Sequence, residues 1–260
     1  MRVAVRVKSL RVLVVDDNAV NQKLAAAILL RAGHIATVVP NGREAVSAME
    51  RERFDVVLMD VQMPVMGGFE ATRLIREMEA GSGRRTPIIA VTASAMKGDR
   101  EACVEAGMDA FVSKPIQSAR FVETLEQLAS KSLPDLNAGA EPDDTDGSET
   151  LDEAALMKLV GGSRQLAGEL AGLYLDDLEP RVDEITAAVG ELDAGRLLAA
   201  AHALRGSSGS LKAENVSAAA GALETMGRSG EMDGVQRALD VLNLALASLR
   251  PRLVLLAGRA

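Results

Sequence analysis

The sequence predicts an α/β domain with a doubly wound, five-stranded parallel sheet, followed by an all-α domain that forms an antiparallel four-helix bundle. Two observations predict this fold. Short apolar runs and helical stretches alternate strictly from Arg11 to about Ser130, which is typical of a parallel sheet with helices on both faces. After Leu151 the strand patterns stop, and Ala, Leu and Glu recur at helical spacing.

The expected strands of the first half are short and apolar, with Gly, Pro or polar residues at their ends, and they cover 12–15, 35–39, 56–59, 88–91 and 110–112. The expected helices cover 20–31, 43–52, 69–79, 97–106 and 117–129. The unbroken apolar run from Val56 to Met59 indicates a strand that is covered on both faces.

The second half predicts helices over 163–189, 193–211, 215–226 and 235–249, with Pro180 as a kink or break in the first of them. We expect Pro251 to Ala260 to form a frayed terminus. Between the halves, residues 131–150 are acidic and turn-rich, which predicts a flexible linker. The expected domains are therefore 1–130 and 151–260.

Composition limits the classes of function. The formal charge of -8 and the pI near 5.0 argue against nucleic acid as the main partner. No apolar run approaches the roughly 20 residues that span a bilayer, and no signal peptide is visible, so we expect a cytoplasmic protein without a membrane partner. The single cysteine, Cys103, and His34 in a turn are both expected to be structural residues.

Polar residues follow the predicted strands at one edge of the sheet. Asp16 and Asp17 follow the first strand, Asp60 the third, Thr92 the fourth and Lys114 the fifth. Three carboxylates repel one another unless a cation joins them, and an all-oxygen cluster suits Mg²⁺. With Mg²⁺ bridging to a phosphoryl group, Lys114 and Thr92 bind its remaining oxygens, and an aspartate serves as the nucleophile.

This half resembles the receiver domain of a two-component response regulator. The matching pieces are Val-Val-Asp-Asp-Asn at 14–18, Leu-Met-Asp-Val-Gln-Met-Pro at 58–64, Val-Thr-Ala at 91–93 and Ser-Lys-Pro at 113–115. The resemblance implies a flavodoxin-like sheet and makes Asp60 the phosphoacceptor. Asp17 or Asn18 is also a candidate helix cap, the usual role of an acidic residue after a strand.

The resemblance also implies roles for the residues around Asp60. Asp16, Asp17 and the backbone carbonyl of Gln62 are expected to hold Mg²⁺ with Asp60. Lys114 is expected to pair with the phosphoryl group, through a cis peptide to Pro115, while Thr92 and the ring of Phe111 move when Asp60 is modified.

In the second half, His202 lies beside a predicted core stripe formed by Leu197, Ala201, Leu204, Ser208 and Leu211. Its own face carries Arg205, Gly206 and Gly209, so we expect an accessible imidazole with room for another protein's active site. A neutral imidazole nitrogen is a competent nucleophile for phosphorus, and Arg205 can steady the negative charge that results.

The run Ala-His-Ala-Leu-Arg-Gly-Ser-Ser-Gly at 201–209 is similar to the signature of histidine-containing phosphotransfer domains. The resemblance implies that His202 becomes a phosphohistidine. Arg205 stands where the family commonly has Lys, which keeps the charge and changes the hydrogen-bond geometry.

The sequence therefore predicts a phosphorelay protein, with an upstream histidine kinase or hybrid kinase as donor and a downstream response regulator receiver as acceptor. No kinase signature is visible, so we expect a phosphotransfer protein and not an enzyme. Direct exchange between Asp60 and His202 is a further hypothesis. The alternative is a phosphorylation-controlled binding module or phosphate sink.

Two other readings have less support. A phosphatase that uses Asp60 lacks the second acid two positions on, where Gln62 stands. The chain is also similar to the carboxyl-terminal part of hybrid sensor kinases. The short distance from Met1 to the first strand favours a separate protein.

Overall fold

The computed structural model describes residues 9–92, 97–114, 118–129 and 150–259, so Pro115 and the predicted linker residues 131–149 lie outside the described residues. These residues divide into two compact units, one built on a β-sheet and one made of helices. Within the described part of the chain, no helix combines the length and the apolar character needed to cross a membrane.

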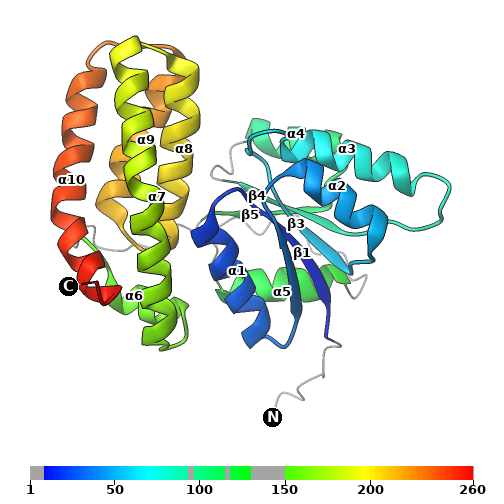
Figure 1. Ribbon diagram of the computed structural model, residues 1–260. Helices are drawn as coiled ribbons and strands as arrows, with labels where there is room; N and C mark the ends of the chain where they lie inside the picture. The colour runs from blue at the N-terminus through cyan, green and yellow to red at the C-terminus, as the bar shows by residue number, and fades with distance from the viewer. Residues whose placement is uncertain (1–8, 93–96, 115–117, 130–149, 260) are drawn as a thin grey trace. The chain divides into compact units, whose positions relative to one another are not determined.

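The first unit contains a parallel sheet with the strand order β2-β1-β3-β4-β5. Its strands are β1 (Arg11–Val15), β2 (Ile35–Val39), β3 (Val56–Asp60), β4 (Ile88–Thr92) and β5 (Ala110–Ser113). Helices α1 (Ala19–Arg31) and α5 (Ser118–Ala129) cover one face, and α2 (Gly42–Arg51), α3 (Gly68–Glu79) and α4 (Lys97–Ala106) cover the other (Figure 1). The predicted doubly wound sheet is confirmed, with every strand and helix end within one residue of its predicted place.

The apolar runs of the strands supply both faces of the sheet. Leu13 and Val15 point into the cluster beneath α2, α3 and α4, and Val12 and Val14 point to the opposite face, since successive side chains alternate. All four side chains are almost fully buried. Cys103 of α4 lies in the first of these clusters, so its predicted structural role fits its packing.

The loop after β1 separates a helix cap from two acids. The side-chain oxygen of Asn18 accepts the backbone N–H groups of Val20 and Asn21, at 3.0 and 3.2 Å. Asn18 is therefore the residue that caps α1. Asp16 and Asp17, at the carboxyl end of β1, are therefore not needed to cap this helix.

His34, in the turn before β2, is a buried residue. Its Nδ1 accepts the backbone N–H of Leu10 at 3.4 Å, and its Nε2 lies 3.5 Å from a carboxylate oxygen of Glu126 on α5. These contacts join the turn to β1 and α5, which supports the predicted structural role.

The second unit contains α6 (Glu153–Leu159), α7 (Arg164–Glu191), α8 (Ala194–Ser210), α9 (Glu214–Ser229) and α10 (Val235–Leu256). The four long helices lie side by side, joined by short turns (Figure 1). This arrangement agrees with the predicted bundle, whereas α6 was not predicted. The predicted stripe of α8 is core: Leu197, Ala201, Leu204, Ser208 and Leu211 are all buried, and the Ser208 hydroxyl lies 2.8 Å from that of Tyr174.

Two prolines lie inside continuous helices. Pro180 does not break α7, which excludes one of the two predicted effects, a kink or a break. α10 continues through Pro251 to Leu256, which corrects the expected frayed terminus. An internal proline costs about 3 kcal/mol, and each buried Leu or Ile stabilises by about 1.5–3 kcal/mol. Buried side chains on both sides of each proline therefore outweigh its cost; they are Leu178, Ile185, Leu249 and Leu253.

The loop between β3 and α3 is folded tightly against the end of its own strand. The N–H of Gly68 donates to the carbonyl of Val61 at 3.0 Å, and a Cβ atom at Gly68 would lie 2.2 Å from the carbonyl oxygen of Asp60. Only glycine fits there. The compact turn also places Val65 at a φ of 71°, a conformation that costs a non-glycine residue about 1–3 kcal/mol.

We predict that Gly68→Ala destabilises the sheet unit by about 3 kcal/mol, because the new methyl group must displace the backbone of Asp60. Urea unfolding followed by circular dichroism measures the effect. Gly67→Ala is the matched control, since a Cβ there meets nothing closer than 3.3 Å. Equal, small effects of the two substitutions would show that the loop shifts freely.

Candidate functional site

Three carboxylates gather at the carboxyl edge of the sheet. Asp16 and Asp17 follow β1, Asp60 ends β3, and these two strands are neighbours. One carboxylate oxygen from each residue lies within 4.8 Å of the others. Asp16 and Asp60 are buried and Asp17 is half-buried. Three acids at this spacing form an all-oxygen donor set that fits a hard divalent cation such as Mg²⁺.

Lys114 joins two of these carboxylates. Its Nζ lies 2.7 Å from Oδ2 of Asp60 and 3.0 Å from Oδ2 of Asp16. The backbone fixes the position of the lysine, because its N–H donates to the carbonyl of Thr92 at 2.7 Å. The buried ammonium group therefore compensates part of the negative charge of the cluster.

The charges shift the pKa values of both partners. Burial raises the pKa of Asp60 to about 6; Lys114 opposes this rise, and the charges of Asp16 and Asp17 add to it. For Lys114, burial lowers the pKa, but the two carboxylates outweigh burial and hold it above its usual value. Lys114 is therefore fully charged at neutral pH. Asp60 changes its protonation state at a pH not far below neutrality.

The other residues predicted for this site lie around Asp60. Asp60 pairs with Val91 of β4, so Thr92 is one residue beyond that pair, and Gln62 donates its N–H to Oδ1 of Asp60 at 3.3 Å. Phe111 of β5 pairs with Ala90, which places Phe111 and Thr92 on the same face of the sheet, since side chains two residues apart share a face. The structure thus brings Asp16, Asp17, Asp60 and Lys114 together, with Gln62 beside Asp60, and it places Thr92 and Phe111 on the neighbouring strands β4 and β5.

The second candidate site lies between α8 and α9. Nδ1 of His202 lies 3.1 Å from Oε1 of Glu224, and the other carboxylate oxygen of Glu224 accepts a hydrogen bond from Arg205 at 2.6 Å. Arg228, one turn further along α9, donates to Oε1 at 2.7 Å. One buried carboxylate thus accepts from an imidazole and two guanidinium groups.

Glu224 is ionised at neutral pH. Burial alone would raise its pKa, but the hydrogen bond from His202, the charge of Arg205 and the hydrogen bond from Arg228 outweigh burial and lower the pKa to about 2. An ionised carboxylate only accepts hydrogen bonds, so Nδ1 of His202 carries the proton. The lone pair of the neutral imidazole is therefore on Nε2.

The surroundings of His202 differ from the prediction. The imidazole was expected to be accessible, but His202 is largely buried, with 9% of its surface exposed, and Gly206 and Gly209 are buried too. The side chain of Arg205 contacts Glu224. Sequence reasoning missed Glu224 and Arg228, because both lie on the next helix, although an acid and a base four residues apart on α9 are visible as a helical ion pair.

Two family models match the two halves of the chain. The family model for the response regulator receiver domain matches residues 12–126, and the model for the Hpt domain matches residues 169–251. The chain carries a receiver domain followed by an Hpt domain. These domains indicate a protein of two-component phosphorelay signalling.

Curated relatives extend the comparison over both domains. The sensor histidine kinase GacS of Pseudomonas protegens is 33% identical over 92% of this chain and 26% of its own length. The sensory/regulatory protein RpfC of Xanthomonas campestris is 30% identical over 87% of this chain and 32% of its own. The chain thus spans about a third or less of these relatives.

Solved receiver structures match the first domain. The receiver domain of the sensor histidine kinase PA1611 of Pseudomonas aeruginosa was solved with magnesium in its active site cleft. It is 41% identical, covers 47% of this chain and 99% of its own, and has a TM-score of 0.43.

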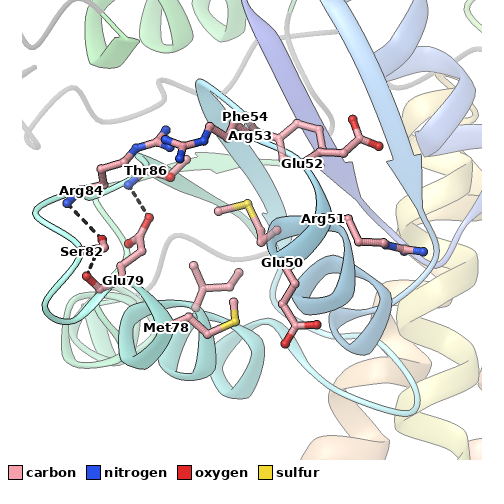
Figure 2. A pocket seen from close by; sticks show the side chains of 12 residues that line it. Glu50, Arg51, Glu52, Arg53, Phe54, Met78, Glu79, Ser82, Arg84 and Thr86 are labelled. Atoms are coloured by element: carbon pink, nitrogen blue, oxygen red, sulfur yellow. Dashed lines mark hydrogen bonds between the residues drawn. The ribbon is translucent and has the colours of Figure 1, made fainter.

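The receiver domain also has a hollow of about 410 Å³ away from the carboxylates. The ends of α2 and α3 line it together with Ser82, Arg84 and Thr86, and Figure 2 shows Glu79 turned to the backbone N–H of Thr86. The helices end there before β3 and β4 begin, so the hollow lies at the amino edge of the sheet. It does not belong to the site around Asp60.

We predict that Asp60→Asn raises the free energy of unfolding of the metal-free receiver domain by about 1–3 kcal/mol at pH 7.5. The folded-state pKa of Asp60, about 6, lies above the 3.8 of an unperturbed aspartate, so the stability that this group contributes is present below about pH 4 and lost as the pH rises through 6. Asn avoids that loss. Urea midpoints in EDTA at pH 7.5 and pH 5 measure it, and the gain should shrink at pH 5.

Asp55→Asn is the control for this experiment, because Asp55 is exposed at the opposite end of β3 and accepts the N–H of Arg11. It should give no gain that depends on pH in this way. A destabilised Asp60→Asn variant at pH 7.5 would mean that the contact with Lys114 outweighs the burial of the charge.

Proposed function

We propose that Asp60 and His202 are the two phosphoryl-carrying residues of this protein. The observation that carries the proposal is the pairing of each reactive atom with its compensating group. Lys114 contacts the carboxylate of Asp60, and Glu224 contacts the imidazole of His202. The receiver domain would extend over about 1–130 and the phosphotransfer domain over 151–260.

In the receiver domain, Asp60 is the nucleophile and Lys114 binds an oxygen of the incoming phosphoryl group. The hydroxyl of Thr92 binds another oxygen, and its movement together with the ring of Phe111 reports the modification. Because the backbone of Lys114 is bonded to the carbonyl of Thr92, the cation and the hydroxyl are held together at the ends of the neighbouring strands β5 and β4.

Asp16, Asp17, Asp60 and the backbone carbonyl of Gln62 would hold Mg²⁺. The close spacing of the three carboxylates fits this ion. Bound there, Mg²⁺ supplies positive charge to the phosphoryl oxygens. The chain's own part is to align the carboxylate of Asp60 and to screen its neighbours with Lys114.

In the Hpt domain, Glu224 holds the proton of His202 on Nδ1, so that Nε2 is the attacking atom. When the lone pair of Nε2 forms a bond to phosphorus, the bond between phosphorus and the aspartyl oxygen breaks, and its electron pair returns to the carboxylate. The ring gains one positive charge, which the adjacent carboxylate of Glu224 stabilises. No proton has to move, and the reverse transfer follows the same path.

The donor of the relay is an upstream histidine kinase or hybrid kinase, and the final acceptor is a receiver domain of a downstream response regulator. The chain itself acts as a carrier and not as a kinase. The presence of both proposed phosphoryl-carrying residues in one chain supports direct exchange between Asp60 and His202.

We predict that phosphoramidate with Mg²⁺ places base-labile phosphate on Asp60 and acid-labile phosphate on His202. Asp60→Asn should keep only the acid-labile label and His202→Gln only the base-labile label. Mass spectrometry of the intact and digested chain measures both. Label on Asp60 with none on His202 under any donor would support the binding-module function in place of the relay.

We predict that Glu224→Gln slows phosphoryl transfer to His202 by about 10- to 100-fold, since a hydrogen bond to a charged group contributes about 1.5–3 kcal/mol. The amide still accepts from Nδ1 but does not balance the charge of the ring. Quench-flow labelling measures the rate, with the exposed Glu231→Gln as the control. An unchanged rate at unchanged helical content would rule out this role of Glu224.

A further inference from the structure

The hollow at the amino edge of the receiver sheet has an apolar floor. Phe54, Ile75 and Met78 line it; the first two are almost fully buried, whereas Met78 keeps 39% of its surface exposed. A volume of about 410 Å³ is in the range of protein sites that hold a ligand group. Methionine also adapts its shape readily to a bound apolar group. The floor therefore suits an apolar side chain or ring of a ligand.

Two carboxylates in the lining of the hollow are already compensated by arginines from outside it. Glu52 pairs with Arg11, and Glu79 pairs with Arg76 and accepts the backbone N–H of Thr86 at 2.6 Å. Neither Arg11 nor Arg76 lines the hollow. These acids consequently do not balance the charge of the arginines that do line it.

Arg53 and Arg84 form the basic part of the rim. Both are exposed, and in the part of the chain that the structure describes neither guanidinium group forms an ion pair with a carboxylate. Figure 2 shows the two side chains pointing toward one another, while the carboxylate of Glu50 points away from them. Like charges in this arrangement repel one another, and an anion placed between them removes that repulsion. The rim therefore favours an anionic ligand.

Rim and floor together define the chemistry of the ligand. An inorganic anion would contact the rim and leave the floor uncovered, and a purely apolar group would leave the two arginines uncompensated. An acidic peptide segment carries carboxylates and apolar side chains on neighbouring residues, and a guanidinium group binds a carboxylate with two parallel hydrogen bonds. The whole chain has a formal charge of -8, so this basic rim is a local exception.

We propose that the hollow between the ends of α2 and α3 binds an acidic peptide segment of a partner protein. An apolar side chain of the segment covers Phe54 and Met78, and its carboxylates bind Arg53 and Arg84. The inference goes beyond the proposed function, because the hollow lies at the opposite end of β3 from Asp60. A five-residue strand is about 16 Å long, so a bound segment leaves the carboxylates at the other edge accessible.

The experiment measures binding of a fluorescein-labelled synthetic peptide, Glu-Glu-Leu-Glu-Glu-Leu-Glu-Glu, to the full chain by fluorescence polarisation. The chain is compared with its Arg53→Gln, Arg84→Gln and Met78→Gln variants. Arg43→Gln is the matched control, because Arg43 is exposed at the other end of α2 and does not line the hollow. A second peptide has glutamine in place of every glutamate, and a third has glutamine in place of both leucines.

We expect Arg53→Gln and Arg84→Gln each to weaken binding of the acidic peptide by about tenfold, since each removes a charge-assisted hydrogen bond. Met78→Gln and the peptide without leucine should each weaken it by about threefold or more. The uncharged peptide should bind at least about tenfold more weakly, and Arg43→Gln should bind like the parent. Urea midpoints should be unchanged for the arginine variants, because both side chains are exposed and form no ion pair.

Four results would overturn the proposal: no binding of the acidic peptide to the parent chain, parental affinity in both rim variants, an equal loss in Arg43→Gln, or equal binding of the uncharged peptide. Tighter binding of a synthetic peptide with the chain's own sequence 133–149 would assign the hollow to that acidic stretch in place of a partner. Labelling of Asp60 by phosphoramidate should be the same with and without bound peptide. A loss of label only when peptide is bound would contradict the separation of the two edges.

Discussion

The contact of Lys114 with two buried carboxylates is the interaction on which the receiver site depends. Asp60 and Asp16 approach each other because β1 and β3 are neighbours in the sheet, and the burial that raises the pKa of Asp60 also makes its charge costly. Lys114 directly follows β5, which is separated from β3 by β4. It reaches the cluster because its backbone is bonded to the end of β4 at Thr92. The compensation of charge at this site therefore depends on the order and the register of the strands.

The charges around the two candidate sites are arranged in opposite ways. In the receiver domain a cation lies among carboxylates, and burial raises the pKa of the central acid, Asp60, to about 6 although the cation opposes this rise. In the Hpt domain a carboxylate lies among cations, and its pKa falls, so that it stays charged beside the imidazole. The first arrangement accommodates additional positive charge from a metal ion and a dianionic phosphoryl group. The second favours a ring that becomes positive when Nε2 is modified. Each arrangement thus suits the charge that its reactive atom acquires.

Much of the fold and of the receiver site could be predicted from the sequence, because the signals are local. Apolar runs of four or five residues define buried strands. The residues that follow parallel strands lie at one edge of the sheet, so the closeness of Asp16, Asp60 and Lys114 could be predicted before the structure was known. The helical spacing of the apolar residues was also enough to predict which face of α8 is buried. The errors have a different origin. The burial of His202 and its partner Glu224 depend on how α9 packs against α8, and no spacing within one helix encodes that contact. The continuity of α10 through Pro251 likewise depends on side chains that are buried by other helices.

In the receiver domain the backbone strain lies at the exposed Val65 and not at the buried Asp60. Asp60 itself has regular strand backbone, paired with Val91, so the reactive carboxylate carries no backbone strain of its own. The close approach of Gly68 to the carbonyl of Asp60 fixes the end of the strand, and the loop between them contains one left-handed residue, Val65. A cost of about 1–3 kcal/mol is substantial against a typical stability of about 5–15 kcal/mol. The loop can hold it because contacts on both sides oppose its release. The same contacts keep the proposed nucleophile in place, so the position of Asp60 and the strain at Val65 depend on one set of contacts.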